Sequence, residues 1–185
     1  RGFHEDSLHR NPNGKFQRPK FITNFLLSKG RKNDIKIVKH FSQNNNSIIS
    51  GNSSYTSQRI KEVYGIRCDF IHPCVDREEY TDNTDQTTNP YSQVKESEYV
   101  VTIGTANWAK GSMEAISMLS GTNISLVHVG GGRIKEIKTL QKHASNKKVN
   151  LWVSPRLSSQ QLSILMKDAL AIVSMAHKEP FGLTP

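Results

Sequence analysis

The chain has 185 residues, of which 35% are hydrophobic and 22% charged, enough for one domain of ordinary size or for parts of two. This composition excludes a disordered chain, and no uncharged apolar run approaches the roughly 18 residues that a membrane-spanning helix needs. Twenty-five Lys and Arg against sixteen Asp and Glu give a net charge of +9, so an anionic partner is expected. The sequence opens on Arg1 without an initiator Met and stops on Pro185, and we expect both ends to be cuts in a longer chain.

The charge divides the chain into three segments. Residues 1–40 carry +7, residues 41–98 carry −4 and residues 99–185 carry +6. The first segment is polar apart from the cluster "FITNFLL", which predicts a loop followed by a basic helix over about 20–32. Two interpretations of its charge stay open: a charged helix that packs on a sheet, or a surface over 15–39 that rests on anionic lipid head groups.

After the basic segment the sequence predicts strand, helix, strand. The run "SIIS" is typical of a short strand, Ser54 offers a helix N-cap, and Gly65 stands where a left-handed C-cap would end the helix. "CDFI" predicts the second strand. Residues 77–98 are acidic and polar with almost nothing to bury, as in a linker. We therefore expect the end of one domain over 1–76, then this linker, then part of a second domain over 99–185.

Four apolar runs follow, "YVVTIG", "ISLVHVGG", "VNLWV" and "LAIVSMA". Their spacing is too long for hairpins, and the intervals repeat apolar residues at helical spacing, with a capping box from Ser158 to Gln161 before the last run. Continuous apolar strands that alternate with amphipathic helices predict an α/β fold, in which helices cover both faces of a doubly wound parallel sheet.

The residues that follow each strand are the candidate ligand contacts, because ligands of such sheets bind at the carboxyl ends of the strands. In chain order they are Gly104, Thr105 and Lys110, then Gly130 to Arg133, then Arg156, then His177 and Glu179. Glycines let a backbone approach a phosphate, helix N-termini present free N–H groups, and Lys or Arg supplies the opposite charge. A nucleotide or another phosphorylated ligand is therefore expected.

Each of these features also has a simpler interpretation. The three consecutive glycines could form a turn without a ligand. Lys110 and Arg156 could be solvated surface cations, His177 a structural histidine, and Glu179 a loop carboxylate. Their alignment along one edge of one sheet favours the ligand site.

Several motifs resemble those of one enzyme family. "NSSYTSQRIKEVYGIRCDFIHPCVD" is similar to the segment that joins the two halves of a GT-B glycosyltransferase of the family-4 (group 1) type. "VVTIGTANWAKGSMEAI" resembles that family's "GR-x-x-x-x-KG" entry, "SLVHVGGG" its "L-x-I-x-G-x-G" strand, and the end of the chain its "E-P-F-G-L-x-x-x-E" stretch. The resemblance covers residues 47–185, about three quarters of the chain. It implies that 1–76 ends an acceptor-side Rossmann-like domain and that 99–185 is a partial donor-binding domain.

The resemblance also implies roles for individual residues. Lys110 matches a lysine that contacts the donor diphosphate, and Glu179 matches a glutamate that holds hydroxyls of the transferred sugar, so these two are the expected catalytic residues. The remaining donor contacts that it implies are Gly104, Thr105, Gly130, Arg156, Leu157, His177, Phe181, Gly182 and Leu183. Thr105 departs from the family, which has an arginine there, so one diphosphate cation is missing or comes from elsewhere.

The activity implied is transfer of a sugar from a UDP- or GDP-linked donor to a glycan or lipid-linked acceptor, with retention of configuration and without a metal or cofactor. The piece of chain given is expected to be inactive alone. A nucleotide-sugar epimerase and a phosphorylase stay open as alternatives. A basic nucleic-acid-binding protein is a further alternative, but nucleic acid is not the expected partner, since aromatics are only 8% of residues and no recognition motif is present.

The two cysteines, Cys68 and Cys74, bear on the compartment. Two thiols cannot make a disulfide framework, and they lack the companions that a zinc site would need. Reduced thiols suit the cytoplasm, so we expect a cytoplasmic protein that could also contact the cytoplasmic face of a membrane.

Overall fold

The computed structural model describes residue 4 and residues 9–74, 88–94 and 97–177. Within it the chain divides into two compact units. The first comprises mainly Lys15–Cys74, and the second comprises mainly Val75–Lys178. Each unit is described separately below.

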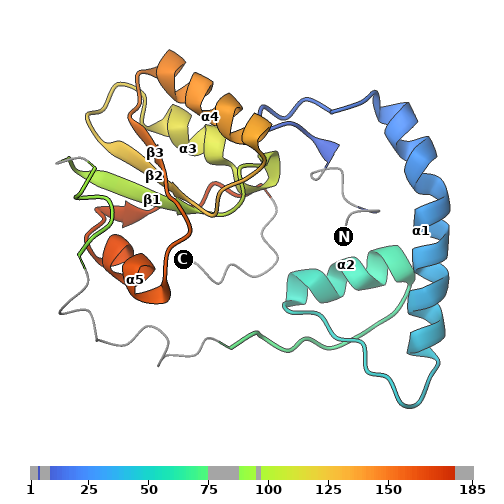
Figure 1. Cartoon of the computed structure of the whole chain (residues 1–185). Helices are drawn as coiled ribbons and strands as arrows, with labels where there is room; N and C mark the ends of the chain where they lie inside the picture. The colour runs from blue at the N-terminus through green and yellow to red at the C-terminus, as the bar shows by residue number, and fades with distance from the viewer. Residues whose placement is uncertain (1–3, 5–8, 75–87, 95–96, 178–185) are drawn as a thin grey trace. The chain divides into compact units, whose positions relative to one another are not determined.

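The second unit is built on a parallel sheet of four strands, β1 (Tyr99–Ile103), β2 (Ser125–Val129), β3 (Leu151–Val153) and β4 (Ala171–Ile172). Their order across the sheet is β3-β2-β1-β4, and each neighbouring pair is parallel. The strands alternate along the chain with a short 3-10 helix, η4 (Trp108–Lys110), and with α3 (Ser112–Met118), α4 (Ile134–Lys147) and α5 (Ser159–Lys167) (Figure 1). The prediction of an α/β fold with a parallel sheet between helices is confirmed.

Apolar side chains cover both faces of this sheet. On one face Val100 and Leu126 pack with residues of α3 and α4, among them Ile116 and Leu140. On the other face the alternate strand residues, such as Val127, pack with α5. Alternation along a strand sends successive side chains to opposite faces, so strands with apolar residues on both faces need a helix layer on each side.

The predicted helix ends in this unit form as expected. Ser158 caps α5, with its hydroxyl oxygen accepting from the Gln161 N–H at 3.2 Å while the Gln161 Oε1 accepts from the Ser158 N–H at 3.0 Å. This reciprocal pair satisfies two backbone donors at the helix start. The capping box that the sequence predicts is therefore confirmed.

Part of the segment expected to be linker packs on the second unit. Tyr91 is only 1% exposed, and its ring lies 4.5 Å from that of Tyr99 and 5.5 Å from that of Trp152, centroid to centroid. The Asn89 side-chain amide donates to the Tyr99 hydroxyl and to the Asp168 carboxylate, both at 2.7 Å. The expectation that this stretch has almost nothing to bury is wrong at Tyr91, because one aromatic ring suffices to anchor a polar segment.

In its described residues, the first unit contains two helices, α1 (Lys20–Ser42) and α2 (Ser54–Tyr64). The basic helix predicted over 20–32 forms but runs ten residues further. The second helix has its N-cap at Ser53 rather than Ser54, and Gly65 ends it in the left-handed conformation, as predicted. The Tyr64 hydroxyl donates to Asp34 of α1 at 2.7 Å and so ties the helices together.

The two strands predicted beside α2 do not form. The structure describes an isolated parallel bridge between Gly51, the residue after "SIIS", and Phe70 of "CDFI", and Ile48 is 94% exposed. A β-strand needs neighbours on which to build its ladder, and the described part of this unit offers none. The correction is thus a tertiary one, since the apolar runs themselves are present.

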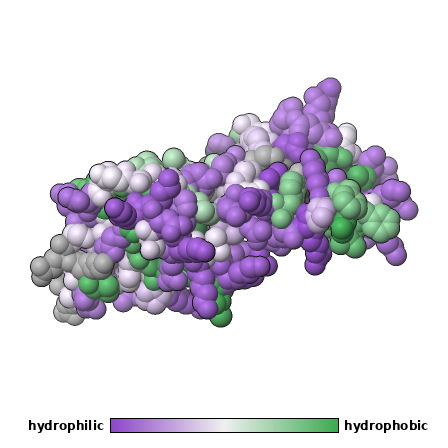
Figure 2. All heavy atoms as spheres, turned by 90° about the horizontal axis from the view of Figure 1, so that it is seen from above, coloured by the Kyte–Doolittle hydropathy of each residue, from purple (hydrophilic) through white to green (hydrophobic). Residues whose placement is uncertain are grey.

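Apolar side chains remain at the surface of the first unit. On α1 the most exposed are Phe21 (74%) and Phe25 (78%), and Figure 2 shows apolar side chains among hydrophilic ones over this part of the chain. Within the described residues, no helix combines the length and the apolar character that crossing a membrane requires.

Candidate functional site

The strand order places a switch point at β1. From β1 the chain moves to β2 and β3 on one side, and then returns to form β4 on the other side of β1. At such a point the connections leave the sheet in opposite directions, which opens a crevice at the carboxyl ends of the two strands. The segments after β1 and β4 are therefore where a ligand is expected.

The segments that follow β1 and β2 are in contact through their backbones, and glycines make this close approach possible. The Gly104 N–H donates to the Val129 carbonyl at 2.8 Å, and the Ala106 N–H donates to the Gly131 carbonyl at 2.8 Å. A Cβ on Gly130, whose φ is 115°, would lie 2.7 Å from the Gly104 oxygen. Only glycine fits there, so the predicted site residues Gly104 and Gly130 meet at one edge of the sheet.

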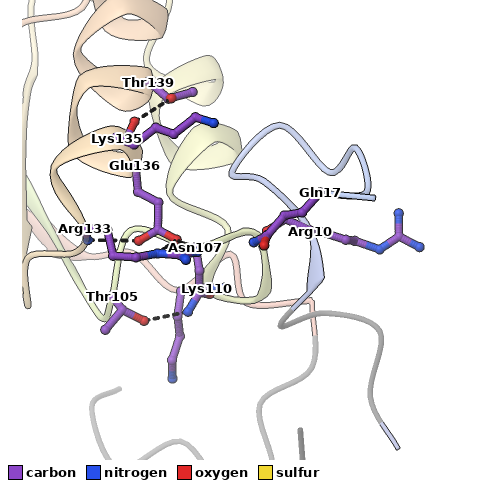
Figure 3. Close-up of polar contacts among 9 residues, drawn as sticks. All are labelled: Arg10, Gln17, Thr105, Asn107, Lys110, Arg133, Lys135, Glu136 and Thr139. Carbon is purple, nitrogen blue, oxygen red and sulfur yellow. Dashed lines mark hydrogen bonds and ion pairs between the residues drawn. The ribbon is translucent and has the colours of Figure 1, made fainter. Parts of the chain in front are cut away.

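A capped turn carries Lys110 to the same edge. The Asn107 Oδ1 accepts from the Lys110 N–H at 3.2 Å, and its Nδ2 donates to the Thr105 hydroxyl at 2.7 Å (Figure 3). A Cβ on Gly104 would lie 2.9 Å from the Lys110 Cγ, so the lysine stem runs over that glycine. The ammonium group points away from the Arg133–Glu136 pair in Figure 3. The Asn107 cap was not singled out in the sequence, although Asn three residues before Lys110 is a typical N-cap signal.

The glycine turn after β2 is followed by an ion pair at the start of α4. The Arg133 guanidinium donates to Glu136 Oε1 at 2.6 Å from Nη2 and 3.0 Å from Nε, and its backbone N–H donates to Glu136 Oε2 at 3.0 Å. Burial raises the pKa of Glu136, but the Arg133 hydrogen bonds outweigh it and leave the pKa below its ordinary value. A carboxylate at this helix N-terminus opposes a second anion there. The glycines after β2 therefore fit a turn better than a phosphate cradle.

A buried histidine supports this turn from beneath. His128 on β2 has no exposed surface, its Nε2 donates to the Gly131 carbonyl at 3.2 Å, and its Nδ1 lies 3.5 Å from the Ser112 hydroxyl. Burial lowers the pKa of His128 below its ordinary value of 6.5, although the Gly131 hydrogen bond opposes the shift. A neutral imidazole therefore holds the glycine turn. Nothing in the local sequence pattern identified it.

The exit of β4 is fastened to the turn that carries Lys110. The His177 N–H donates to the Ala109 carbonyl at 3.0 Å, and the His177 ring stacks on Trp108 with centroids 4.0 Å apart and planes at 13°. The His177 Nε2 lies 2.9 Å from Glu114 Oε1. His177, which the sequence places among the donor contacts, is thus held by two residues, Trp108 and Glu114, that the sequence did not single out.

The exit of β3 lies farther along the same edge. Arg156 is exposed, and Leu157 packs with the apolar cluster on the α5 face of the sheet. The Ser154 N–H donates to the His128 carbonyl at 2.9 Å, which continues the sheet contact for one residue beyond the strand.

Four predicted site residues, Glu179, Phe181, Gly182 and Leu183, lie outside the described residues. Among the residues that are described, no group of three or more His, Cys, Asp or Glu could hold a metal ion. Of the predicted site residues that are described, Gly104, Thr105, Lys110, Gly130 and His177 lie at the carboxyl edge of β1, β2 and β4.

Solved structures share this fold, which confirms the predicted α/β fold of the GT-B type. The chain is similar to a sucrose-phosphate synthase from Thermosynechococcus elongatus, with a TM-score of 0.59 and 15% identity over 74% of this chain and 36% of that one. It is also similar to a glycosyltransferase from Rickettsia africae ESF-5, with a TM-score of 0.54 and 14% identity over 72% of this chain and 39% of that one. The chain thus spans less than two fifths of the length of either. At such identities the likeness is one of fold.

Sequence comparison adds no closer relative. No protein-family model matches the chain, and no curated protein matches it significantly.

Proposed function

We propose that this chain is the donor-binding part of a glycosyltransferase of the family-4 type, which transfers a sugar from a UDP- or GDP-linked donor to a glycan or lipid-linked acceptor hydroxyl. The observation that carries the proposal is the assembly of Gly104, Lys110 and His177 at the switch point of a parallel sheet. The similarity of this fold to glycosyltransferases supports it. Since the chain spans under 40% of those proteins, catalysis is proposed for a longer chain and not for this part alone.

The chemistry follows from charge at the leaving group. When the bond between sugar and diphosphate breaks, negative charge develops on the departing nucleoside diphosphate. A lysine ammonium held in place at a site that excludes water stabilises this charge more strongly than it stabilises the bound donor, and so lowers the barrier. We assign this role to Lys110, and we assign to Glu179 the positioning of the sugar hydroxyls. We further propose that the reaction retains configuration and needs no metal, with protein cations and helix N-termini in place of Mg²⁺.

Binding of nucleoside diphosphates to the 185-residue chain tests the donor site. Isothermal titration with UDP, GDP and uridine should show binding of at least one diphosphate and weaker binding of the nucleoside. Lys110→Ala should weaken diphosphate binding about 10- to 100-fold, as expected for loss of a charged hydrogen bond. Lys138→Ala, on the exposed face of α4, is the matched control. Equal binding by both variants would overturn the role of Lys110.

Activity assays on the longer protein separate the remaining possibilities. A radiolabelled donor should give a glycosylated acceptor with the configuration retained, whereas an epimerised nucleotide sugar or a sugar phosphate would indicate an epimerase or a phosphorylase. Activity that disappears in EDTA and returns with Mn²⁺ or Mg²⁺ would overturn the metal-independent mechanism.

We propose in addition that the protein is cytoplasmic and that its helix α1 contacts an anionic membrane surface. Phe21, Phe25, Lys29, Lys32, Lys36 and Lys39 recur every three or four residues and so share one face of the helix. All six are exposed. Two aromatic side chains that can enter the head-group region, followed by four cations, suit an anionic bilayer, where each lysine contributes about 1 kcal/mol.

Liposome sedimentation tests the membrane contact. Vesicles with 30% phosphatidylserine should bind the protein, and replacing the four lysines by Gln should weaken binding at least tenfold. Unchanged binding would remove the proposal. Salt-sensitive binding to DNA or RNA by a chain that ignores UDP and GDP would instead favour the nucleic-acid alternative.

A further inference from the structure

The segment that leaves β4 is fixed to the turn before α3 at several points on both sides of Lys110. The carbonyl of Ala109, the residue before it, accepts from the His177 N–H at 3.0 Å. Gly111, the residue after it, has φ of 68°, and a Cβ there would lie 1.9 Å from the Met175 carbonyl oxygen. The backbone of Lys110 is therefore placed by contacts with the β4 exit, although Lys110 itself belongs to the β1 exit.

Two side chains complete this attachment. Trp108 lies flat against the His177 ring at 4.0 Å, and Glu114 reaches His177 Nε2 at 2.9 Å. An aromatic stack stabilises a contact beyond what the buried apolar area alone contributes. We call the group of Trp108, Glu114 and His177 the latch.

The latch contains a carboxylate atom that stability alone does not explain. Glu114 Oε2 is buried and has no hydrogen-bond partner among the described residues. A buried acceptor without a partner destabilises the folded state, and an apolar side chain on α3 would avoid this cost. Glu114 is therefore better explained by its bond to His177 than by the packing of α3.

We propose that Trp108 and Glu114 are positioning residues for the sugar-diphosphate donor. Acting through His177, they fix the turn that carries Lys110, the proposed diphosphate cation, to the described end of the β4 exit. Glu179, the proposed sugar contact, follows His177 by two residues in the sequence. This inference rests on the proposed donor site. A ligand that spans both strand exits depends on their relative position, whereas a ligand held by Lys110 alone does not.

The consequence is a difference between two ligands of the same site. A nucleotide sugar must reach both exits, but the free nucleoside diphosphate needs only the cation side. Breaking the latch should weaken binding of the nucleotide sugar more than binding of the nucleoside diphosphate. If these residues had a purely structural role, replacing them would weaken binding of the two ligands equally.

Titration of latch variants with both ligands tests the proposal. Trp108→Leu and Glu114→Leu should each weaken binding of the nucleotide sugar about tenfold and that of the matching diphosphate less than threefold. Trp108→Phe keeps a ring for stacking, and Glu114→Gln keeps an acceptor for His177, so both should stay within threefold of the wild type. Gln141→Leu, on the exposed surface of α4, controls for an added apolar side chain.

A second measurement separates failure of this inference from failure of the proposed function. Amide hydrogen exchange at His177 reports its bond to Ala109 without any ligand, and Glu114→Leu should accelerate it at least fivefold. If the wild-type chain binds neither ligand, the donor site is wrong and the positioning role falls with it. If the wild type binds both, then unchanged exchange in Glu114→Leu, or an equal loss for the two ligands, overturns the positioning role and leaves the donor site standing.

Discussion

The two units of this chain differ in how far they bury their apolar side chains. The second unit encloses its strands between two helix layers, and residues such as Leu126, Val127 and Leu140 have no exposed surface. The first unit has a 23-residue helix on which Thr23 alone is buried, while Phe21 and Phe25 stay exposed. The sheet thus accounts for most of the hydrophobic stabilisation of the chain.

This difference has a consequence for function. A site that must hold a cation within a few tenths of an ångström needs rigid support, and the proposed donor site lies on the unit with the closed core. The exposed apolar and basic face of α1 instead suits contact with a partner surface. The following predictions test this contrast, from the largest expected effect to the smallest.

Truncation of a buried strand residue should have the largest effect. Leu126→Ala should lower the free energy of unfolding of the second unit by about 3–5 kcal/mol, because it leaves a cavity between the sheet and its helices. Urea unfolding followed by tryptophan fluorescence reports this unit alone, since both tryptophans, Trp108 and Trp152, lie in it. The control Leu170→Ala, at a residue that is 55% exposed, should change it by less than about 0.5 kcal/mol. Similar losses in the two variants would contradict a closed core.

A Cβ at Gly111 should have the next largest effect. Gly111→Ala should cost about 2–4 kcal/mol, because the methyl group meets the Met175 carbonyl and the backbone is left-handed there. Gly121 is left-handed too, with φ of 86°, but has nothing within 4 Å, so Gly121→Ala should cost only about 1–2 kcal/mol. The same unfolding assay measures both. Equal costs would show that conformation, and not the contact with the β4 exit, determines the effect.

Acid should weaken the two units at different pH. Burial lowers the pKa of His128, so the unfolded chain binds a proton more readily, and this contribution to stability, complete above pH 6.5, is lost as pH falls below it. In the first unit burial raises the pKa of Asp34, but hydrogen bonds from Tyr64 and His4 outweigh it, so the pKa lies below 3.8. The stabilisation from Asp34 is lost only as pH falls through that lower value.

Unfolding at pH 7.5 and 5.5 checks this difference. The free energy of unfolding of the second unit should be lower at pH 5.5 than at pH 7.5. This difference should be smaller in His128→Gln, because glutamine has no proton to gain. Should the loss of stability at pH 5.5 persist in His128→Gln, another group would be responsible.

The smallest effect is expected at the bond that joins α1 and α2. Tyr64→Phe should destabilise the first unit by about 1 kcal/mol, the usual value of one hydrogen bond. Burial and the bond to Asp34 raise the pKa of Tyr64 to about 12, so the stability that this tyrosine contributes is complete below pH 10 and is lost as pH rises towards 12. Amide exchange in α2 is the measurement, with Tyr55→Phe as the control, since Tyr55 is 44% exposed. Equal exchange in both variants would show that other contacts hold the helix pair.

Much of the second unit could be predicted from sequence because its signals are local. The apolar strands, the periodic helices and the capping box from Ser158 to Gln161 depend on residues within a few positions of one another. The same rules predicted two strands in the first unit and were wrong, because a strand also needs a neighbour. The burial of Tyr91 was missed for a similar reason, since its partners Tyr99 and Trp152 come later in the chain.

The candidate site, too, could be predicted from the sequence only in part. Sequence placed Gly104, Lys110, Gly130 and His177 at the ends of parallel strands, and the structure brings them to one edge of the sheet. It could not show that Arg133 is engaged by Glu136, although the two are only three residues apart, because Arg at an N-cap is not a recognised signal.

In the second unit, the sequence by itself determined the order of strands and helices, the glycine turns and the cations beside them, because period, capping and backbone freedom are local properties. Only the tertiary structure decided that Arg133 pairs with Glu136 and that the turn carrying Lys110 is held by the β4 exit. Glu114 and His177 are 63 residues apart, and nothing in either local pattern predicts their contact. That contact exists because β4 returns to the side of β1 opposite β2, which places the turn before α3 beside the end of the last strand.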